Sequence, residues 1–449
     1  MERGSFGSKL GIVLATAGSA VGLGNVWRFP FMAGQNGGAA FILIYFACIL
    51  LLGIPGMVSE FIVGRHSQTN AARAYTKISG RRGWGFVGVL GIITSTIILG
   101  FYAVVAGWCL QYLGVSVLGQ LKGDATFVTS YFQTFSADPV RPAVLGVVFI
   151  LITHLIIVRG VQRGIERAAK LLMPLLLVLL VVIVVASCSL PGAMKGIRFL
   201  LFPDFSKVNA DVVLEALGQA FFSLSLGTAC LCTYASYFKR DTNLLGSATQ
   251  IALLDTVIAI LAGLMIFPAA FSVGVNPDSG PSLIFITLPN VFQQAFASAP
   301  QVGYVISILF YALLVFAALT STISMHEIGT AFFHEELNMK RSHAAWILTV
   351  VCGIICVFCS LSVGNSQFSL LGQSLMDFCD MITAQVMLPM GALLTSLLIG
   401  WRVSPRLVEE EFTNWGTLPS AVFRAYLFSV RYVVPFCILL ILMHQFGIV

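Results

Sequence analysis

The chain has 449 residues, of which 58% are hydrophobic and only 10% are charged, and its mean hydropathy is +0.93. Soluble globular domains carry about a quarter charged residues, so this composition excludes the soluble classes and indicates a polytopic membrane protein. The net charge of +6 is informative mainly through the positions of the basic residues along the chain.

The first apolar segment, residues 10–31, contains an interruption where a membrane-spanning helix should be continuous. Gly18, Gly22 and Gly24 fall inside it, and the pair Gly24-Asn25 disfavours helix. Lipid cannot satisfy free N–H and C=O groups, so broken backbone at this depth must line a protein cavity. The freed carbonyls can bind a cation and the freed N–H groups an anion, which makes this segment a candidate binding site.

Hydropathy predicts eleven membrane spans, because a helix needs about 20 apolar residues to cross the hydrocarbon core. The predicted spans are residues 9–34, 38–62, 86–118, 141–159, 168–190, 211–238, 245–274, 300–334, 343–362, 370–400 and 424–447. Most of the 25 lysines and arginines lie in segments that share a side with the N-terminus. The positive-inside rule therefore predicts a multi-pass protein of the cell or inner membrane, with a cytoplasmic N-terminus and an external C-terminus.

The sixth span repeats the anomaly of the first. Residues 221–228, Phe-Phe-Ser-Leu-Ser-Leu-Gly-Thr, place hydroxyls and a glycine in its middle. Small residues here could merely let helices pack closely. Two interruptions five spans apart instead favour inverted repeats with a site between them. We expect a first repeat in residues 1–190, a second in 191–401, and an inner loop with an extra helix in 402–449.

Six motifs, spread over nearly the whole chain, resemble those of the neurotransmitter:sodium symporter family in its prokaryotic, eleven-helix form. They are AVGLGNVWRFP (20–30), NGGAAF (36–41), GIPGMVSEFIVGR (53–65), QAFFSLSLG (219–227), TYASY (233–237) and ALTSTIS (318–324). The resemblance implies an all-α polytopic membrane protein with 11 transmembrane helices. Two inverted five-helix repeats with broken helices 1 and 6, plus one extra helix, are known of this fold, as is a site at the membrane midplane.

The function that the resemblance implies is sodium-coupled symport rather than enzymatic catalysis. A neutral, hydrophobic or aromatic L-amino acid would be imported by alternating access. A same-fold sodium symporter for another small organic solute is the alternative. A channel would need a continuous polar stripe, and a membrane enzyme would need a metal or nucleophile constellation. The partners expected are the amino acid and membrane lipid, with no nucleic acid, and the oligomeric state is left open.

The resemblance implies two co-transported sodium ions, and sodium is a hard cation that favours several oxygen ligands. The first site would use the carbonyl of Ala20 and the side chains of Asn25, Ser223 and Asp255, completed by the substrate carboxylate. The second would use the carbonyls of Gly18, Val21 and Ala317 with the hydroxyls of Thr320 and Ser321. Taken without the family, the hydroxyl run in span eight would more often be a helix-packing patch.

Asp255 lies in an apolar span, and a carboxylate inside the membrane is a functional candidate by default. A protonated aspartic acid bonded to a neighbour is the alternative. Many relatives have asparagine here and bind chloride instead. Tyr45, Gln219 and Ser223 match positions of such a chloride site, but Ala259 lacks the hydroxyl expected there. We therefore expect chloride-independent transport, with Asp255 supplying the balancing charge.

A substrate pocket is implied at the two breaks. Tyr102 and the freed N–H groups of Leu23 and Gly24 would meet the substrate carboxylate, and carbonyls at the half-helix ends would meet the ammonium group. The expected pocket residues are Ala20, Gly22, Leu23, Gly24, Ile98, Tyr102, Phe222, Ser223, Ser225, Thr228, Thr322 and Met325. This apolar pocket with hydroxyls and no net charge suits a neutral L-amino acid.

Two gates are implied by the same resemblance. Arg28, whose charge near the membrane is costly unless it faces water or a partner, would pair with Asp380 at the outer end. Arg3 and Glu335 would form the cytoplasmic pair, supported by Tyr237. A surface pair contributes little to stability, but one that forms only on closing can bias a two-state equilibrium.

Two more positions have expected structural roles. Glu60 in the second span resembles the acid that holds the interruption of span six. Phe6 stands where the family usually has tryptophan, beside the cytoplasmic gate. The ten cysteines lie in or next to apolar segments, and we interpret them as small core residues rather than disulfides or metal ligands.

Overall fold

The computed structural model describes residues 5–121, 125–274, 283–363, 369–370, 372–419, 421–445 and 447, and these are almost entirely helical. Within these residues, nine helices are long and apolar enough to cross a membrane. They are Ala39–Ser67, Arg82–Val117, Arg141–Val158, Val161–Cys188, Leu244–Ser272, Pro300–Glu336, Arg341–Ser362, Leu375–Arg402 and Phe423–Gln445. They match nine of the predicted spans within a few residues, except that the helix of the fifth predicted span begins at Val161 rather than near residue 168.

The two remaining predicted spans are the interrupted ones. The first is a helix pair, Lys9–Ala20 and Gly24–Gln35, bent by 54° at the break. The other consists of α11 (Ala210–Ser223) and α12 (Cys230–Ala235), separated by six residues without regular helix. Both interruptions fall where the glycines and hydroxyls of the sequence predict them.

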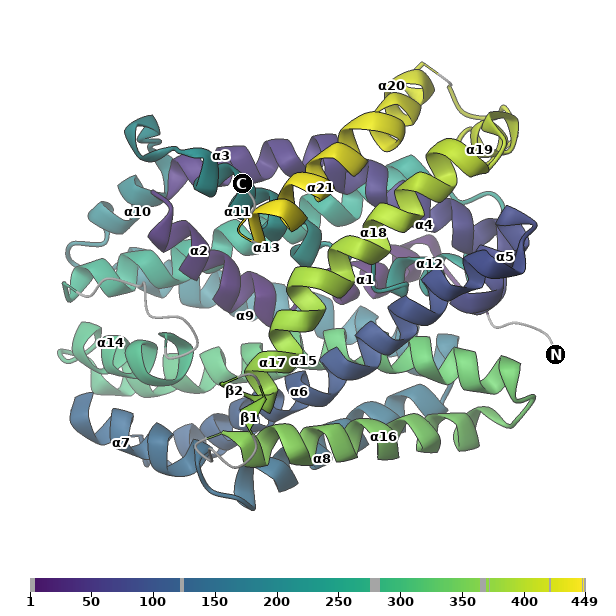
Figure 1. The fold of residues 1–449 in the computed structure, drawn as a ribbon. Coiled ribbons are helices and arrows are strands. Elements are labelled where there is room, and N and C mark those ends of the chain that lie inside the picture. Colours follow the sequence, from purple (N-terminus) through teal and green to yellow (C-terminus); the bar gives the residue numbers. More distant parts are fainter. Residues whose placement is uncertain are drawn as a thin grey trace.

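The α-helices of the spans carry the labels of Figure 1. They are α1 (Lys9–Ala20), α2 (Phe29–Gln35), α3 (Ala39–Cys48), α4 (Ile54–Ser67), α6 (Gly85–Val117), α8 (Arg141–Val158), α9 (Arg167–Cys188), α13 (Leu244–Ser272), α15 (Pro300–Glu336), α16 (Arg341–Ser362), α17 (Leu375–Met381), α18 (Leu388–Leu397), α20 (Phe423–Phe428) and α21 (Val434–Gln445). Wider, π-helical turns continue several of them, at Gly24–Arg28, Ile49–Gly53, Val161–Glu166, Ile382–Met387, Leu398–Arg402 and Ser429–Val433.

Short elements cover the two ends of the bundle. They are α5 (Ala71–Ser79), α7 (Ala125–Ser136), α10 (Met194–Leu201), α14 (Leu288–Ala295) with the turn Leu283–Thr287, α19 (Pro405–Phe412), the 3-10 turns Arg82–Trp84 and Phe205–Lys207, and the hairpin of β1 (Ser369–Leu370) and β2 (Gln373–Ser374). In Figure 1, α7, α10 and α14 lie at one end, and α5, α19 and the N-terminus lie at the other. After the orientation that the positive-inside rule predicts, we call these the outer end and the N-terminal end.

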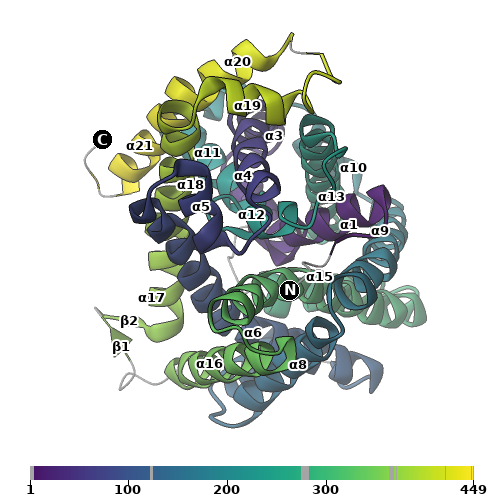
Figure 2. The same cartoon turned by 90° about the vertical axis from the view of Figure 1, so that its right-hand side faces the viewer.

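The helix that carries the first break runs through the interior of the bundle. Figure 2, seen from the N-terminal end, shows α1 surrounded by other helices, and it contacts α9, α13 and α15. Small residues allow the close packing around the second break. A methyl group at Gly64 of α4 would lie 2.0 Å from the carbonyl oxygen of Cys232, so only glycine lets α12 approach this closely.

Candidate functional site

The break in the first span is stabilised by one side chain from its own segment and one from α6. After Ala20 the backbone of Val21 turns extended, and helix resumes at Gly24. The side-chain oxygen of Asn25 accepts a hydrogen bond of 3.0 Å from the N–H of Gly22. The N–H of Leu23 donates to the hydroxyl of Tyr102 at 3.1 Å. One of the two N–H groups expected at the substrate carboxylate, that of Leu23, therefore faces Tyr102.

The break in the sixth span is stabilised by a side chain of another helix, Glu60 of α4. Ser225, Gly227 and Ala229 adopt left-handed backbone with φ of 54°, 82° and 60°. The carboxylate of Glu60 accepts hydrogen bonds from the N–H groups of Gly227 at 2.7 Å and Cys232 at 3.4 Å. This confirms the predicted role of Glu60, which satisfies backbone donors that lipid could not.

The two breaks lie against each other. The hydroxyl of Ser225 donates to the carbonyl of Ser19, at the end of α1, at 2.9 Å. A methyl group at Gly24 would lie 3.1 Å from the ring of Phe222. Residues about 200 positions apart in the chain thus form one polar region in the interior of the bundle.

Asp255 of α13 is the acidic centre of that region, and its side chain is fully buried. One carboxylate oxygen accepts from the side-chain amide of Asn25 at 2.7 Å. The other accepts from the hydroxyls of Ser223 at 2.8 Å and Tyr45 at 3.1 Å. Three donors from three other segments converge on this group, and buried charges require such partners. Ala20, the fourth predicted member, is the last residue of α1 and follows Ser19, whose carbonyl accepts from Ser225.

A second oxygen cluster joins α1 to α15. The hydroxyl of Thr320 lies 3.2 Å from the carbonyl oxygen of Val21 and 2.9 Å from that of Ala317. The hydroxyl of Ser321 lies 3.4 Å from the same Val21 oxygen. A methyl group at Gly18 would lie 3.3 Å from Cβ of Thr320. All five residues of the expected second site therefore lie together.

Some of the residues expected in the substrate pocket lie at the two breaks. A methyl group at Gly22 would lie 2.3 Å from the Ser321 hydroxyl and 3.1 Å from the Tyr102 hydroxyl, so a glycine is required there. The hydroxyl of Thr228 donates to the carbonyl of Ser225 inside the break. Ile98 is half-buried, and Met325 is buried.

Thr322 differs from the expectation. Its hydroxyl lies 2.8 Å from that of Thr153 on α8 and 3.1 Å from the carbonyl of Leu319. Successive helical residues are about 100° apart, so Thr322 cannot face α1 together with Thr320 and Ser321. It belongs to the packing of α15 on α8.

A cavity of about 290 Å³ lies above the breaks on the outer side. It is lined by Leu23, Gly24, Trp27, Arg28, Phe31, Met32, Phe101, Tyr102, Val105, Phe222, Met376, Asp377 and Asp380. The guanidinium of Arg28 lies over the ring of Phe222, 4.2 Å from its centroid. Asp380 lines the same cavity as Arg28, and no ion pair joins the two among the described residues. Both residues of the predicted outer gate therefore line one cavity.

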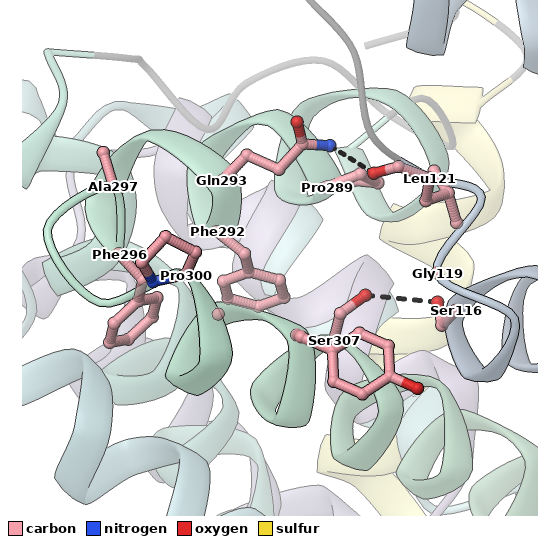
Figure 3. A pocket seen from close by; sticks show the side chains of 12 residues that line it. Ser116, Gly119, Leu121, Pro289, Phe292, Gln293, Phe296, Ala297, Pro300 and Ser307 are labelled. Carbon is pink, nitrogen blue, oxygen red and sulfur yellow. Dashed lines mark hydrogen bonds between the residues drawn. The ribbon is translucent and has the colours of Figure 1, made fainter.

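A separate cavity lies at the outer end, between α6, α14 and α15, and Figure 3 shows the residues that line it. Its volume is about 220 Å³. Its polar groups bond within the protein. Gln293 donates to the carbonyl of Leu121 at 2.6 Å, and the hydroxyls of Ser116 and Ser307 lie 3.1 Å apart. No charged side chain lines it, and it shares no residue with the cavity above the breaks.

At the N-terminal end, aromatic side chains pack around Phe6. Its buried ring lies 5.9 Å from Tyr234 and 6.1 Å from Tyr237, centroid to centroid. Glu335 accepts hydrogen bonds from the backbone and side chain of Asn70 at 2.7 and 3.0 Å. Arg3, its expected partner, lies outside the described residues.

Tyr237 contacts an ion pair, Glu327 with Arg341, that was not predicted from the sequence. Its hydroxyl donates to the buried carboxylate of Glu327 at 2.5 Å, and Glu327 forms an ion pair with Arg341. Glu327 interrupts an apolar span just as Asp255 does. The criterion that identified Asp255, a carboxylate inside a span, would also have found it.

Comparison with known proteins gives a consistent assignment. The model of the sodium:neurotransmitter symporter family matches residues 3–133 and 140–448. An uncharacterised sodium-dependent transporter of Bacillus subtilis (strain 168), YhdH, is 39% identical over 98% of this chain and 97% of its own. An uncharacterised sodium-dependent transporter of Haemophilus influenzae is 32% identical over 98% of this chain and 97% of its own.

A solved structure, MhsT in complex with L-phenylalanine, is 39% identical to the chain. The two superpose with a TM-score of 0.90, covering 99% of this chain and 100% of that one. The two helix breaks, the oxygen clusters beside them and the family match lead to one conclusion: this chain belongs to the sodium:neurotransmitter symporter family and is a sodium-dependent transporter of the membrane, not an enzyme.

Proposed function

We propose that this protein imports a neutral L-amino acid together with two sodium ions by alternating access. The observation that carries the proposal is the meeting of two broken helices at a fully buried carboxylate, with a second oxygen cluster beside it. Broken helices at mid-membrane supply both the positive half-helix ends for a carboxylate and the free carbonyls for a cation.

The first sodium ion would bind at Ala20, Asn25, Ser223 and Asp255, with the substrate carboxylate as the last ligand. The second would bind at Gly18, Val21, Ala317, Thr320 and Ser321. Because the substrate carboxylate serves as an ion ligand, each solute raises the affinity of the other. Two sodium ions and a zwitterion carry a net charge of +2, and the carboxylate of Asp255 lowers the net charge of the site to +1.

The amino-acid side chain would lie among Ile98, Phe222, Thr228 and Met325, and Tyr102 would donate to the substrate carboxylate. Three of these four side chains are apolar, which favours a substrate with a hydrophobic or aromatic side chain. The solved relative crystallised with L-phenylalanine is 39% identical, which supports the same preference.

The transport cycle follows from the two ends of the bundle. With the cytoplasmic end sealed at Phe6, the outer cavity admits two sodium ions and substrate. Pairing of Arg28 with Asp380 then closes the outer end, and release of the Glu335 and Tyr237 contacts opens the inner one. Each charge that moves inward gains about 2.3 kcal/mol per 100 mV of membrane potential. This cycle requires the N-terminus to be cytoplasmic.

The test is uptake in proteoliposomes. Radiolabelled phenylalanine, leucine and other neutral amino acids should accumulate only with an inward sodium gradient. Competition by a panel of amino acids and other small organic solutes then identifies the substrate class. Equal uptake with potassium in place of sodium would refute symport, and competition only by solutes that are not amino acids would refute the substrate assignment.

A further inference from the structure

The N-terminal end of the bundle contains a polar cavity that has no part in the transport path described above. Its volume is about 430 Å³, within the range of small-molecule sites. Three segments far apart in the chain form it: the end of α4 with α5, the loop after α12, and α19 with the turn that follows it. The residues that matter here are Arg65, Lys77, Arg240, Arg406, Glu411 and Trp415.

Two of the four cations in this cavity are neutralised by carboxylates. Arg65 is buried and forms an ion pair with Glu411 at 2.9 Å. Arg406 pairs with Glu410 at 3.1 Å. His66 lies 3.1 Å from the second oxygen of Glu411. The acidic residues of the cavity are thus already engaged.

The other two cations have no carboxylate partner in the described part of the chain. Arg240 is exposed, and its guanidinium lies over the ring of Trp415, 5.8 Å from the centroid. Lys77 is exposed and donates only to the carbonyl of Ser67, at 3.0 Å. The guanidinium of Arg65 also lies over this ring, 5.3 Å from the centroid. A cation–π contact does not use the N–H groups of Arg240 as hydrogen-bond donors, so they remain available to an acceptor.

We propose that this cavity binds a phosphate-bearing anion through Arg240 and Lys77. A planar guanidinium with free N–H groups and a nearby ammonium match the oxygen geometry and charge of a phosphate. Two sources share this chemistry: the headgroup of an anionic phospholipid and a soluble phosphate ester. With a cytoplasmic N-terminus the cavity faces the side where basic residues contact anionic lipids.

The bound anion would act on the inner gate. Arg240 follows α12 by five residues, and the loop between them carries Tyr237, which packs on Phe6. Arg65 already ties this loop to α4 and to the segment after α19, by donating to the carbonyl of Thr242 at 2.6 Å and the side chain of Asn414 at 2.7 Å. An anion between Arg240 and Lys77 adds a second tie, to α5, and favours the state in which the N-terminal end is closed.

Binding is tested on the full chain in uncharged detergent, by thermal unfolding during titration. One arm adds phosphatidylglycerol, with phosphatidylcholine as the uncharged reference, and a second adds glycerol 3-phosphate. Arg240→Gln and Lys77→Gln should each weaken the response roughly fivefold. The matched control is Lys239→Gln, which removes an equal charge from the adjacent, exposed position outside the cavity. It should respond like the unmodified protein.

The two arms separate the sources. Stabilisation by phosphatidylglycerol alone assigns a lipid headgroup, stabilisation by glycerol 3-phosphate alone assigns a soluble ester, and stabilisation by both assigns the phosphate group as the common determinant. Each outcome supports the site only if the Arg240 and Lys77 variants lose the effect and the Lys239 variant keeps it. No stabilisation in either arm, or equal losses in all three variants, would overturn the proposal. Unchanged unfolding temperatures without ligand verify that the variants fold.

Discussion

At the scale of single residues, the proposed ion sites depend on where each short polar side chain points. Thr320, Ser321 and Thr322 are consecutive on α15, yet only the first two approach the carbonyl of Val21. Thr322 bonds to Thr153 on another helix. Successive residues point about 100° apart around a helix, so Thr322 points away from the proposed second sodium site and can serve as a control for it.

Thr320→Val or Ser321→Ala should raise the sodium concentration needed for half-maximal substrate binding by about tenfold or more, because a ligand to a charged group is lost. A scintillation-proximity titration of labelled substrate against sodium measures this shift. The control, Thr322→Val, should leave the sodium dependence unchanged. Equal shifts in all three variants would show that the hydroxyls act through helix packing instead.

The charge of Asp255 leads to a second prediction at this scale. Uptake should be equal in chloride and gluconate, since a chloride ion within a few ångströms of the carboxylate would be repelled by several kcal/mol. Asp255→Asn should weaken or abolish uptake in both salts. Adding Ala259→Ser to it supplies a hydroxyl one turn away and should make uptake respond to chloride. Strict chloride dependence of the unmodified protein would contradict the role of Asp255.

At the scale of elements, the break in the sixth span depends on α4. Glu60 reaches across from α4 to accept from Gly227 and Cys232, and Gly64, one turn further along, lets the two helices approach. In the six-residue break between α11 and α12, Ser225, Gly227 and Ala229 adopt left-handed backbone. This conformation is unfavourable for the two residues that are not glycine. Contacts from α4 therefore hold a conformation that the segment would not keep alone.

Glu60→Gln should destabilise the protein and impair uptake together. The amide nitrogen meets a backbone donor where the carboxylate accepted one, which costs about 1–3 kcal/mol. Thermal unfolding in detergent and uptake in proteoliposomes give the two measurements. Ser59→Ala is the control, because the Ser59 hydroxyl bonds to Tyr426 on α20, away from the break. A Glu60 variant with unchanged unfolding and uptake would rule out this role.

At the scale of the whole molecule, the two ends of the bundle differ in how they are packed around the transport path. At the N-terminal end, Phe6 packs on Tyr234 and Tyr237. The outer end keeps a cavity between Arg28 and Asp380. In the proposed cycle this arrangement would be the outward-facing conformation, and closure of the outer pair would be the next step.

Asp380→Asn should slow uptake several-fold while weakening equilibrium binding much less, because the carboxylate acts on closure rather than in the substrate site. Initial uptake rates and equilibrium binding of labelled substrate, measured on the same preparation, separate the two effects. Asp377→Asn is the matched control, since Asp377 lines the same cavity but bonds to Ser374. Parallel losses of binding and uptake in Asp380→Asn would place the residue in the binding site itself.

The sequence alone determined the spans, the two interruptions and the buried carboxylate of Asp255. These features are local, because hydropathy over about 20 residues and glycines within an apolar run can be recognised without knowing the neighbours. The membership of Thr320 and Ser321 in one cluster with Val21 came from the family motifs rather than from the residues alone.

Only the tertiary structure decided which partners the polar side chains find. The orientation of α15 places Thr322 against Thr153 on α8. Glu327 contacts Tyr237 and Arg341, which come from two other segments. The cavity at Arg240 forms where three segments distant in the chain come together. Helix rotation and loop placement are set by packing across the bundle, and a pattern of neighbouring residues does not contain that information.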